Sequence, residues 1–205
     1  MQISLENLGR RFNREWIFKG LNYQFNHNQA YAILGINGSG KSTLLQVISG
    51  ALTPSVGNLI YTFDGKIIAP ENYYTAISLA APYLELIEDF SLNEVLDFHF
   101  KFKTRFDLLK NSDIISLLGM QKQEHKLIKQ FSSGMKQRVK LALAFCAQTP
   151  VLLLDEPTAN LDVQGIDWYH TMIKQFTANR ITLICSNQSN EYSFCDAQLN
   201  LADYK

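Results

Sequence analysis

The segment at residues 35–42 constrains the fold of this chain more than any other feature of the sequence. It reads Gly-Ile-Asn-Gly-Ser-Gly-Lys-Ser and fits the pattern GxxxxGK[ST]. The apolar run Ala30–Leu34 before it indicates a buried strand, and Lys41–Ser49 has a helical pattern that Gly50 closes. Glycines let the loop backbone point its N–H groups at an anion, and the start of the helix adds a favourable dipole. The segment therefore predicts a phosphate-binding loop between a strand and a helix of an α/β fold.

Two side chains of this loop bear directly on nucleotide chemistry. We expect Lys41 to neutralise the β- and γ-phosphates of a nucleoside triphosphate, and the Ser42 hydroxyl to bind Mg²⁺. The alternative is a glycine-rich turn with an unrelated lysine, but a chance match of this kind occurs only about once in a hundred chains of this size. The predicted nucleotide-binding residues of the loop are Gly35, Asn37, Gly38, Ser39, Gly40, Lys41, Ser42 and Thr43.

A second motif lies in the C-terminal half of the chain. The apolar run Val151–Leu154 indicates a buried strand, and it ends in Asp155 and Glu156. Such a strand brings Asp155 to the edge of the sheet, where a carboxylate can hold Mg²⁺ through water. Glu156 follows one residue later, where it can polarise an attacking water as a general base. An acidic turn in solvent is the alternative for this motif alone, but the two motifs together are typical of P-loop ATPases.

The remaining pattern predicts an α/β chain with two additions. Alternating apolar residues at the N-terminus, among them Ile3 and Leu5, indicate half-buried strands, and Asp64-Gly65 indicates a hairpin. Ser91 and Glu94 form a capping box before a helix in a mostly helical middle third. Helices and strands then alternate, which favours a largely parallel sheet. The other predicted segments are residues 21–25, Leu59–Phe63, Lys66–Ala69, Thr75–Ala80, Asn111–Leu118 (stopped by Gly119), Val139–Ala147, Val163–Thr177 and Ile181–Cys185.

Composition excludes several classes of protein. Lys plus Arg and Asp plus Glu both number 19, so the net charge is zero and nothing favours a nucleic-acid partner. Cys146, Cys185 and Cys195 are scattered and without CxxC spacing, which is typical of reduced, buried thiols in a cytosolic protein rather than of a metal or redox site. The N-terminus does not have the pattern of a signal peptide, and no run is long enough to span a bilayer. Any membrane association is therefore expected to require a partner.

The segment between the two motifs narrows the class of ATPase. Residues 131–138, Phe-Ser-Ser-Gly-Met-Lys-Gln-Arg, resemble the LSGGQ signature of the ATP-binding cassette (ABC) ATPases, and residues 155–162 resemble the DEPT…LD stretch that includes the D-loop. The resemblance covers essentially the whole chain. It implies a single ABC ATPase domain over residues 1–205, with a RecA-like P-loop core, an N-terminal antiparallel β lobe, and a helical lobe inserted at about residues 82–130.

The resemblance also implies a mechanism and the residues that carry it. Two copies pack head to tail and close over two ATP molecules with Mg²⁺, each nucleotide lying between one phosphate loop and the other copy's signature. Ser132, Ser133, Gly134 and Asp162 are then nucleotide-binding residues, although Ser132 also has a simple role as a helix N-cap. Phe12 stands where the family has an aromatic residue that stacks on adenine. Trp16 competes for that role, and either ring can also be a core residue.

Two family positions are filled differently in this chain. The Q-loop glutamine is expected near Ala80-Ala81-Pro82, yet no glutamine lies between Gln46 and Gln121. Asn187 stands where the family has a histidine that contacts the γ-phosphate, and an amide cannot carry positive charge. The predicted catalytic residues are therefore Glu156 and Asn187, and the predicted metal ligands are Ser42 and Asp155. Loss of one transition-state hydrogen bond can lower turnover by ~10²–10³, so we expect slow hydrolysis.

Three functions remain open at this point. The first is a transport motor at the inner face of the plasma membrane, held there by a separate transmembrane permease that docks on the helical lobe. That lobe is rich in aromatic residues (Tyr83, Phe98, Phe100, Phe102 and Phe106), which either face the partner or fill the core of the lobe. The second is a soluble ABC protein acting on nucleic acid or ribosomes, which the neutral charge disfavours. The third is a regulatory module that binds ATP and turns over slowly.

Overall fold

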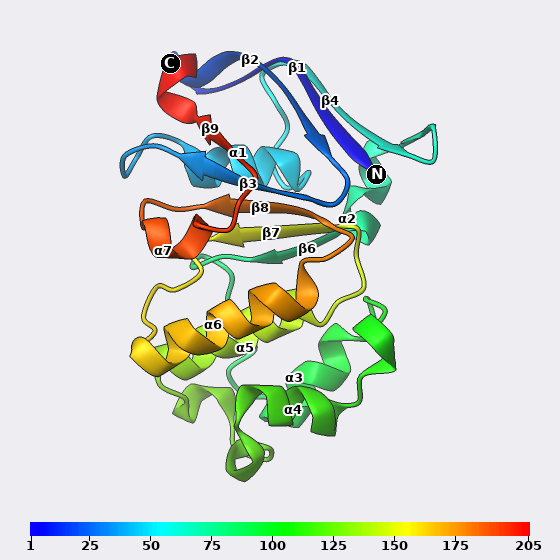
Figure 1. Cartoon of the computed structure of the whole chain (residues 1–205), viewed down its shortest axis with the longest axis vertical. Helices are drawn as coiled ribbons and strands as arrows, with labels where there is room; N and C mark the ends of the chain where they lie inside the picture. The colour runs from blue at the N-terminus through cyan, green and yellow to red at the C-terminus, as the bar shows by residue number, and fades with distance from the viewer.

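Two β-sheets and a helical part are stacked along the long axis of the molecule, as Figure 1 shows. The computed structural model describes residues 1–205. An antiparallel sheet of order β2-β1-β4-β5 lies at one end and a parallel sheet of order β6-β7-β8-β3-β9 lies in the middle. The antiparallel sheet consists of β1 (Gln2–Phe12), β2 (Glu15–Asn26), β4 (Val56–Phe63) and β5 (Lys66–Ile68). The parallel sheet consists of β3 (Gln29–Leu34), β6 (Ile77–Ala80), β7 (Val151–Asp155), β8 (Ile181–Cys185) and β9 (Ala197–Asn200).

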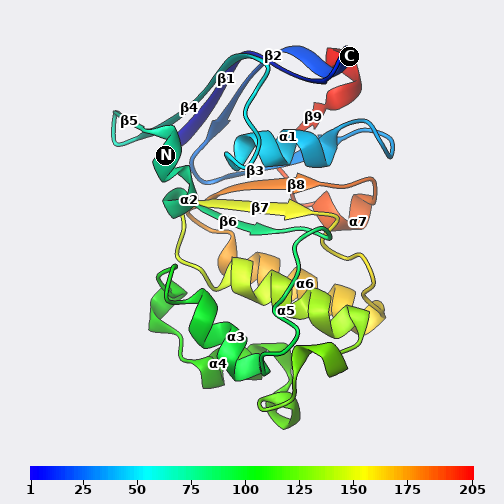
Figure 2. The ribbon, with the colours of Figure 1, turned by 180° about the vertical axis from the view of Figure 1, so that it is seen from behind.

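The parallel sheet is covered on both faces, which explains why its strands are nearly continuous apolar runs. Helix α1 (Lys41–Ile48) lies between the two sheets, whereas α5 (Ser133–Phe145) and α6 (Val163–Phe176) cover the opposite face (Figure 2). The side chains of successive residues of β7 point alternately to the two faces of the sheet. Leu152 and Leu154 join the core with α5 and α6, and Val151 and Leu153 join the core with α1 and the antiparallel sheet.

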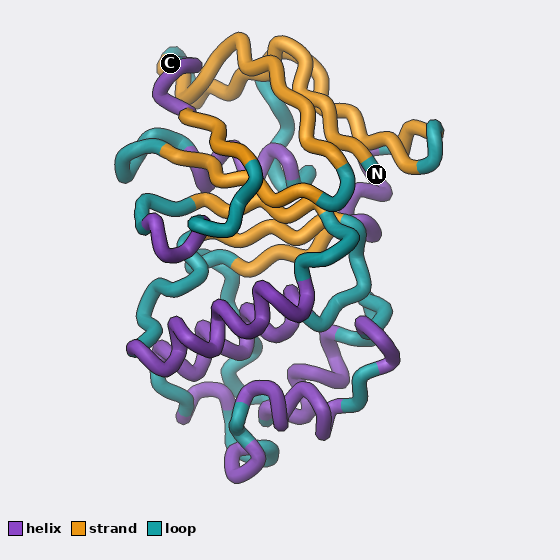
Figure 3. Tube along the Cα trace, viewed as in Figure 1, coloured by secondary structure: helices purple, strands orange, loops and turns teal.

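The helical part lies beyond α5 and α6, as the purple segments of Figure 3 show. Its main helices are α3 (Leu92–His99) and α4 (Asn111–Leu118). None of the helices has both the length and the apolarity needed to cross a bilayer. The short helices elsewhere are α2 (Tyr73–Ala76), α7 (Ser189–Tyr192) and the 3₁₀ turns Pro70–Asn72, Phe106–Leu108, Gln121–Gln123, Ile128–Gln130 and Leu201–Tyr204.

The local signals of the sequence are confirmed where a cap or turn residue marks an end. The Ser91–Glu94 capping box starts α3, and Gly119 ends α4 with φ +64°. Asp64 and Gly65 both have positive φ, as a tight two-residue hairpin requires. The predicted α/β fold, with its antiparallel β lobe and its helical lobe, is also confirmed.

Several predicted boundaries are wrong where tertiary packing decides them. The expected strand Thr75–Ala80 begins only at Ile77, because Tyr73–Ala76 forms a helical turn whose Tyr73 is buried. The helix expected at Val139–Ala147 is α5, which begins at Ser133 and ends at Phe145. The two N-terminal strands are also much longer than the apolar alternation indicates.

The aromatic residues of the helical part divide between the two expected roles. Helix α3 ends at His99, so Phe100 and Phe102 follow the helix and are not part of it. Phe100 and Phe106 pack against the core next to α5. In contrast, Tyr83, Phe98 and Phe102 are 41%, 42% and 67% exposed, which leaves these rings available to a partner.

Candidate functional site

The phosphate loop is shaped by a close approach between the two sheets. It leaves β3 at Gly35 and ends at Gly40, which precedes α1 with φ +102°. A Cβ atom at Gly40 would lie 2.2 Å from Cγ2 of Ile17, a side chain of β2. Only glycine avoids both the strained backbone and this clash. The antiparallel sheet therefore forms one wall of the loop.

A cavity of about 210 Å³ opens above the loop. Lys41 forms its floor and is 5% exposed, with Nζ donating hydrogen bonds to the carbonyl oxygens of Gly35 (2.7 Å) and Ile36 (3.3 Å). The residues that line the cavity are Ile17, Asn37, Gly38, Gly40, Lys41, Ser42, Thr43 and Glu156. The structure thus brings most of the predicted loop residues together with the predicted base. Ile17 was not predicted, because nothing in its local sequence indicates contact with the loop.

Asp155 lies at the carboxyl end of β7, next to the same cavity. Its side chain is 1% exposed, and burial raises the pKa of its carboxyl group above the ordinary value, against a hydrogen bond from the Ser42 hydroxyl that lowers it. The Oδ1 atom of Asp155 has no hydrogen-bond partner. A buried carboxylate oxygen without a partner, beside a serine hydroxyl, suits a hard divalent cation. Because Mg²⁺ takes one or two protein ligands besides phosphate oxygens and water, Asp155 and Ser42 fit it.

Glu156 has a conformation that only its surroundings can maintain. Its φ is +42°, in the left-handed region, and its backbone N–H donates to the carbonyl oxygen of Cys185 at 2.9 Å. Its carboxylate is exposed to the cavity, unlike that of Asp155. A non-glycine residue with positive φ is strained, and such strain is concentrated at functional sites. The two neighbouring carboxylates therefore have different environments, one buried beside Ser42 and one open toward the phosphate loop.

Asn187 lies in the loop that follows β8 and contacts Asn37, one of the residues that line the cavity. Its Nδ2 donates a hydrogen bond of 2.6 Å to Oδ1 of Asn37 in the phosphate loop. The neighbouring backbone is held by a second contact, in which the N–H of Gln188 donates to Oγ of Ser186. The side-chain amide of Asn187 thus donates its hydrogen bond to another residue of the protein, and this bond links two loops that are 150 residues apart.

The signature residues form a separate cavity. Ser132 caps α5, and its Oγ accepts a hydrogen bond from the N–H of Met135 at 3.2 Å. A Cβ atom at Gly134 would lie 2.8 Å from the carbonyl oxygen of Asn160, so the start of α5 packs directly on the D-loop. Asp162 caps α6 through Gly165. This cavity of about 250 Å³ is lined by Ser132, Ser133, Gly134, Met135, Arg138, Asn160, Leu161 and Asp162. It shares no residue with the cavity above the phosphate loop.

The aromatic candidates for adenine binding lie on the β1–β2 hairpin. Phe12 is 45% exposed, and the guanidinium of Arg10 lies 4.6 Å from the centre of its ring. Trp16 is contacted by Arg11 and Lys19 in the same way. Neither ring lines the cavity above the phosphate loop; Ile17 does so from the same hairpin.

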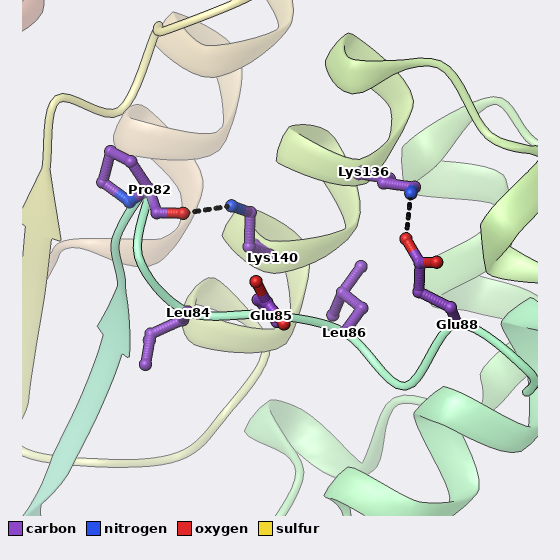
Figure 4. Close-up of a pocket in the computed structure, with 7 residues that line it drawn as sticks. All are labelled: Pro82, Leu84, Glu85, Leu86, Glu88, Lys136 and Lys140. Carbon is purple, nitrogen blue, oxygen red and sulfur yellow. Dashed lines mark hydrogen bonds and ion pairs between the residues drawn. The ribbon is translucent and has the colours of Figure 1, made fainter.

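The segment that should carry the Q-loop glutamine runs along α5 (Figure 4). Lys140 Nζ donates to the carbonyl oxygens of Ala81 (3.4 Å) and Pro82 (3.3 Å), and Lys136 pairs with Glu88. Between this segment and α5 lies a groove of about 390 Å³, lined by Pro82, Leu84, Glu85, Leu86, Glu88, Lys136 and Lys140. This segment contains no glutamine, so none extends from it toward Asp155.

Tyr83 is the side chain of this segment that comes near Asp155, one of the two predicted metal ligands. Burial, followed by the nearby charge of Asp155, raises the pKa of its phenol to about 12, although a hydrogen bond with Gln46 acts the other way. Tyr83 was expected as an aromatic residue of the helical part that either faces a partner or fills the core of the lobe. Its proximity to Asp155 depends on the path of the segment after β6, which the local sequence does not indicate.

Comparisons with known proteins agree with this geometry. The family model described as ABC transporter matches residues 18–159. The chain is 28% identical to the uncharacterized ABC transporter ATP-binding protein YybJ of Bacillus subtilis (strain 168), over 97% of this chain and 92% of that protein. Among solved structures, a putative ABC transporter ATP-binding protein from Pyrococcus furiosus superposes with a TM-score of 0.84 at 21% identity, over the whole of both chains. The dimeric structure of MJ0796, a bacterial ABC transporter cassette, gives a TM-score of 0.81 at 21% identity, over 97% and 94% of the two chains.

Proposed function

The chain belongs to the ABC transporter family, as one of its ATP-binding proteins, and from that premise we propose the activity in detail. It binds ATP with Mg²⁺ and hydrolyses it at the interface of a head-to-tail dimer, and the cycle of closing and opening drives a separate membrane subunit. We propose that residues 1–205 form one ATPase domain, with residues 82–130 as its inserted helical lobe.

One observation carries this proposal: the cavity above the phosphate loop joins the groups needed for phosphoryl transfer. Lys41 and Ser42 line it from α1, Glu156 lines it from the turn after β7, and Asp155 is buried beside Ser42. Lys41 neutralises the β- and γ-phosphates, and the N–H groups of the loop orient them. Mg²⁺ bound at Ser42 and Asp155 would neutralise the negative charge that develops on the phosphate oxygens. Glu156 accepts the proton of the attacking water.

The separation of the two cavities supports the dimer. The signature cavity has helix N-terminal N–H groups that suit a γ-phosphate, yet it contains neither Lys41 nor either of the adjacent carboxylates. The phosphate-loop cavity is lined by Lys41 and Glu156, with Asp155 buried beside Ser42, but it contains no residue of the signature. Two copies arranged head to tail would place each signature over the other copy's phosphate loop. MJ0796, whose structure is dimeric, gives a precedent for a dimer in a cassette of the same fold.

The groove of Figure 4 is our candidate for contact with the membrane subunit. It lies between the segment after β6 and α5, so a segment bound there touches both the metal-site side and the signature helix. The exposed side chains of Leu84, Ile87 and Phe98 lie in this region of the helical part and offer apolar area. We propose that this contact holds the protein at the inner face of the membrane.

Slow turnover is part of the proposal. Asn187 stands in place of a histidine and already binds Asn37, and Ala80-Ala81-Pro82 stands where the family glutamine is expected. Both differences remove groups that assist hydrolysis, and neither removes a group that binds phosphate. The same observations favour a second candidate, an ATP-binding regulatory module with almost no hydrolysis. A near-zero ATPase rate beside tight ATP binding, in the presence of the membrane partner, would favour that second candidate.

The replacement of Lys41 by alanine tests ATP binding. We expect Mg-ATP affinity to fall by at least about tenfold, because charged hydrogen bonds to phosphate are lost, with the fold unchanged. Isothermal titration calorimetry measures the affinity, and Lys136→Ala is the matched control, since Lys136 pairs with Glu88 outside the cavity. Equal affinity for Lys41→Ala and the wild type would contradict the assignment of the phosphate loop.

A further inference from the structure

Glu191 is a buried carboxylate that the proposed reaction does not use directly. It lies on α7 and is 1% exposed. Its Oε1 accepts hydrogen bonds from the backbone N–H of Thr158 (2.8 Å) and from the Thr158 hydroxyl, whereas its Oε2 has no partner. No lysine or arginine forms an ion pair with it. An acid buried in this way is costly, so its contacts with Thr158 require an explanation.

Thr158 belongs to the turn that carries the proposed base. The turn begins at Glu156, whose carbonyl oxygen accepts from the N–H of Ala159 at 3.1 Å, and it continues into the D-loop through the bond from Leu161 N to Thr158 O. Because Glu156 has a strained φ of +42°, contacts from outside the turn help to hold its shape, in addition to these internal hydrogen bonds. Glu191 provides two of these contacts through Thr158.

The same turn receives a third contact from the signature helix. The side chain of Gln137 in α5 donates to the carbonyl oxygen of Pro157 at 2.9 Å. The position of α7 is fixed in turn by α6, since the Tyr169 hydroxyl donates to the Glu191 carbonyl oxygen at 2.8 Å. The turn is thus held between the signature helix on one side and, on the other, the segment that follows Asn187.

We propose that Glu191 is a positioning residue for ATP hydrolysis, acting through Thr158. It fixes the turn of Glu156 relative to the loop of Asn187, so that the carboxylate of Glu156 and the side chain of Asn187 keep one arrangement around the attacking water. The contact depends on the acceptor oxygen, because an apolar side chain of similar size would leave the buried N–H and hydroxyl of Thr158 without a partner. The inference rests on the proposed function, since it concerns the same reaction.

The test compares Glu191→Leu with Glu191→Gln. Leucine removes both hydrogen bonds to Thr158, whereas glutamine keeps an acceptor oxygen at the Oε1 position and removes the charge. We expect Glu191→Leu to lower kcat by roughly 10- to 100-fold, the effect of a misplacement of about 1 Å at a reacting centre, with KM and the calorimetric affinity for Mg-ATP unchanged. Glutamine should restore most of the turnover. Thr158→Val removes only the hydrogen bond from the hydroxyl and keeps the one from the backbone N–H, so it should lower kcat less than Glu191→Leu does and add little to the leucine effect in the double variant.

The possible outcomes separate positioning from a structural role and from failure of the proposed function. Turnover is expressed per ATP-binding site counted by calorimetry, so that unfolded protein does not contribute. An unchanged kcat in Glu191→Leu would overturn the inference. Equal losses in the leucine and glutamine variants, with ATP affinity falling in parallel, would also overturn it. An inactive wild type that still binds ATP would instead contradict the proposed hydrolysis.

Discussion

The phosphate loop and the start of α5 both present backbone N–H groups to an anion, yet their surroundings differ. The phosphate loop lies beside Lys41, Ser42 and two carboxylates. At the start of α5, the side chains are already bonded within the protein. Ser132 caps its own helix, and Arg138, the cation that lines this cavity, donates to the Leu118 carbonyl oxygen and stacks on Trp168.

This difference indicates a division of labour. The first region has the charges needed to hold a nucleotide and activate water, so it can bind ATP alone. The second has only shape and helix N–H groups, so it contributes to binding only when another molecule presents a phosphate. In the dimer that we propose, each chain contributes two unlike halves of a site, and changes in the two halves should affect different measurable quantities.

The largest effect is expected from Glu156→Gln, in the phosphate-loop region. The amide keeps the size of the side chain but cannot accept a proton, so ATP hydrolysis should fall by roughly 10²–10⁴-fold while ATP stays bound. The unhydrolysed nucleotide should then hold the dimer closed, and gel filtration with Mg-ATP should show a shift from monomer to dimer. A variant that hydrolyses ATP at the wild-type rate would exclude Glu156 as the base.

A smaller effect is expected from Gly134→Ala, in the signature region. The added Cβ would lie 2.8 Å from the Asn160 carbonyl oxygen, so the D-loop must move. We expect ATPase activity to fall by about tenfold, because misplacement by a fraction of an ångström disturbs the closed site, while the ATP affinity of the monomer stays the same. Gly65→Ala is the control, since it strains a positive φ in the β4–β5 hairpin, where an added Cβ meets no atom within 4 Å. Loss of ATP affinity in the monomer would contradict the independence of the two regions.

The smallest effect concerns the contact between the phosphate loop and the loop after β8. Asn187→His should raise turnover several-fold with ATP affinity unchanged, because a protonated imidazole offers charge to the γ-phosphate. The gain is limited while no glutamine reaches the metal, and loss of the bond to Asn37 acts against it. Steady-state ATPase assays at saturating Mg-ATP measure it, with Gln188→His as the control. An unchanged or lower rate would mean that the site is built around asparagine.

The same two regions show how much of the site could be predicted from the sequence. The phosphate loop, the acidic strand and the cap of α5 were predictable because each is a local pattern with its own geometry. Both ends of helix α4 were predicted, and its C-terminus is marked by Gly119. The fold class followed from the alternation of strands and helices, and the same pattern indicated the N-terminal strands and the helical middle third, which the family resemblance identified as two lobes.

The contacts between these segments were not predictable. Ile17 lies against Gly40 only because the antiparallel sheet packs over α1, and Asn187 reaches Asn37 only because β8 lies next to β3. The role of Thr158 as a donor to Glu191 likewise depends on where α7 is placed after β8. Such contacts are set by strand order and packing, which no short stretch of sequence contains.

The central claim, that each ATP is shared between the phosphate loop of one copy and the signature of another, can be tested by mixing two inactive variants. Lys41→Ala lacks a working phosphate loop, and a signature variant such as Gly134→Asp places a negative charge where the γ-phosphate is expected. Each should be inactive alone. In an equimolar mixture, half of the random dimers are heterodimers, and in each heterodimer one of the two sites combines an intact phosphate loop with an intact signature. A quarter of all sites are then intact, so we predict that ATPase activity returns to about a quarter of the wild-type rate. A mixture as inactive as its components, with heterodimers present, would contradict the shared site.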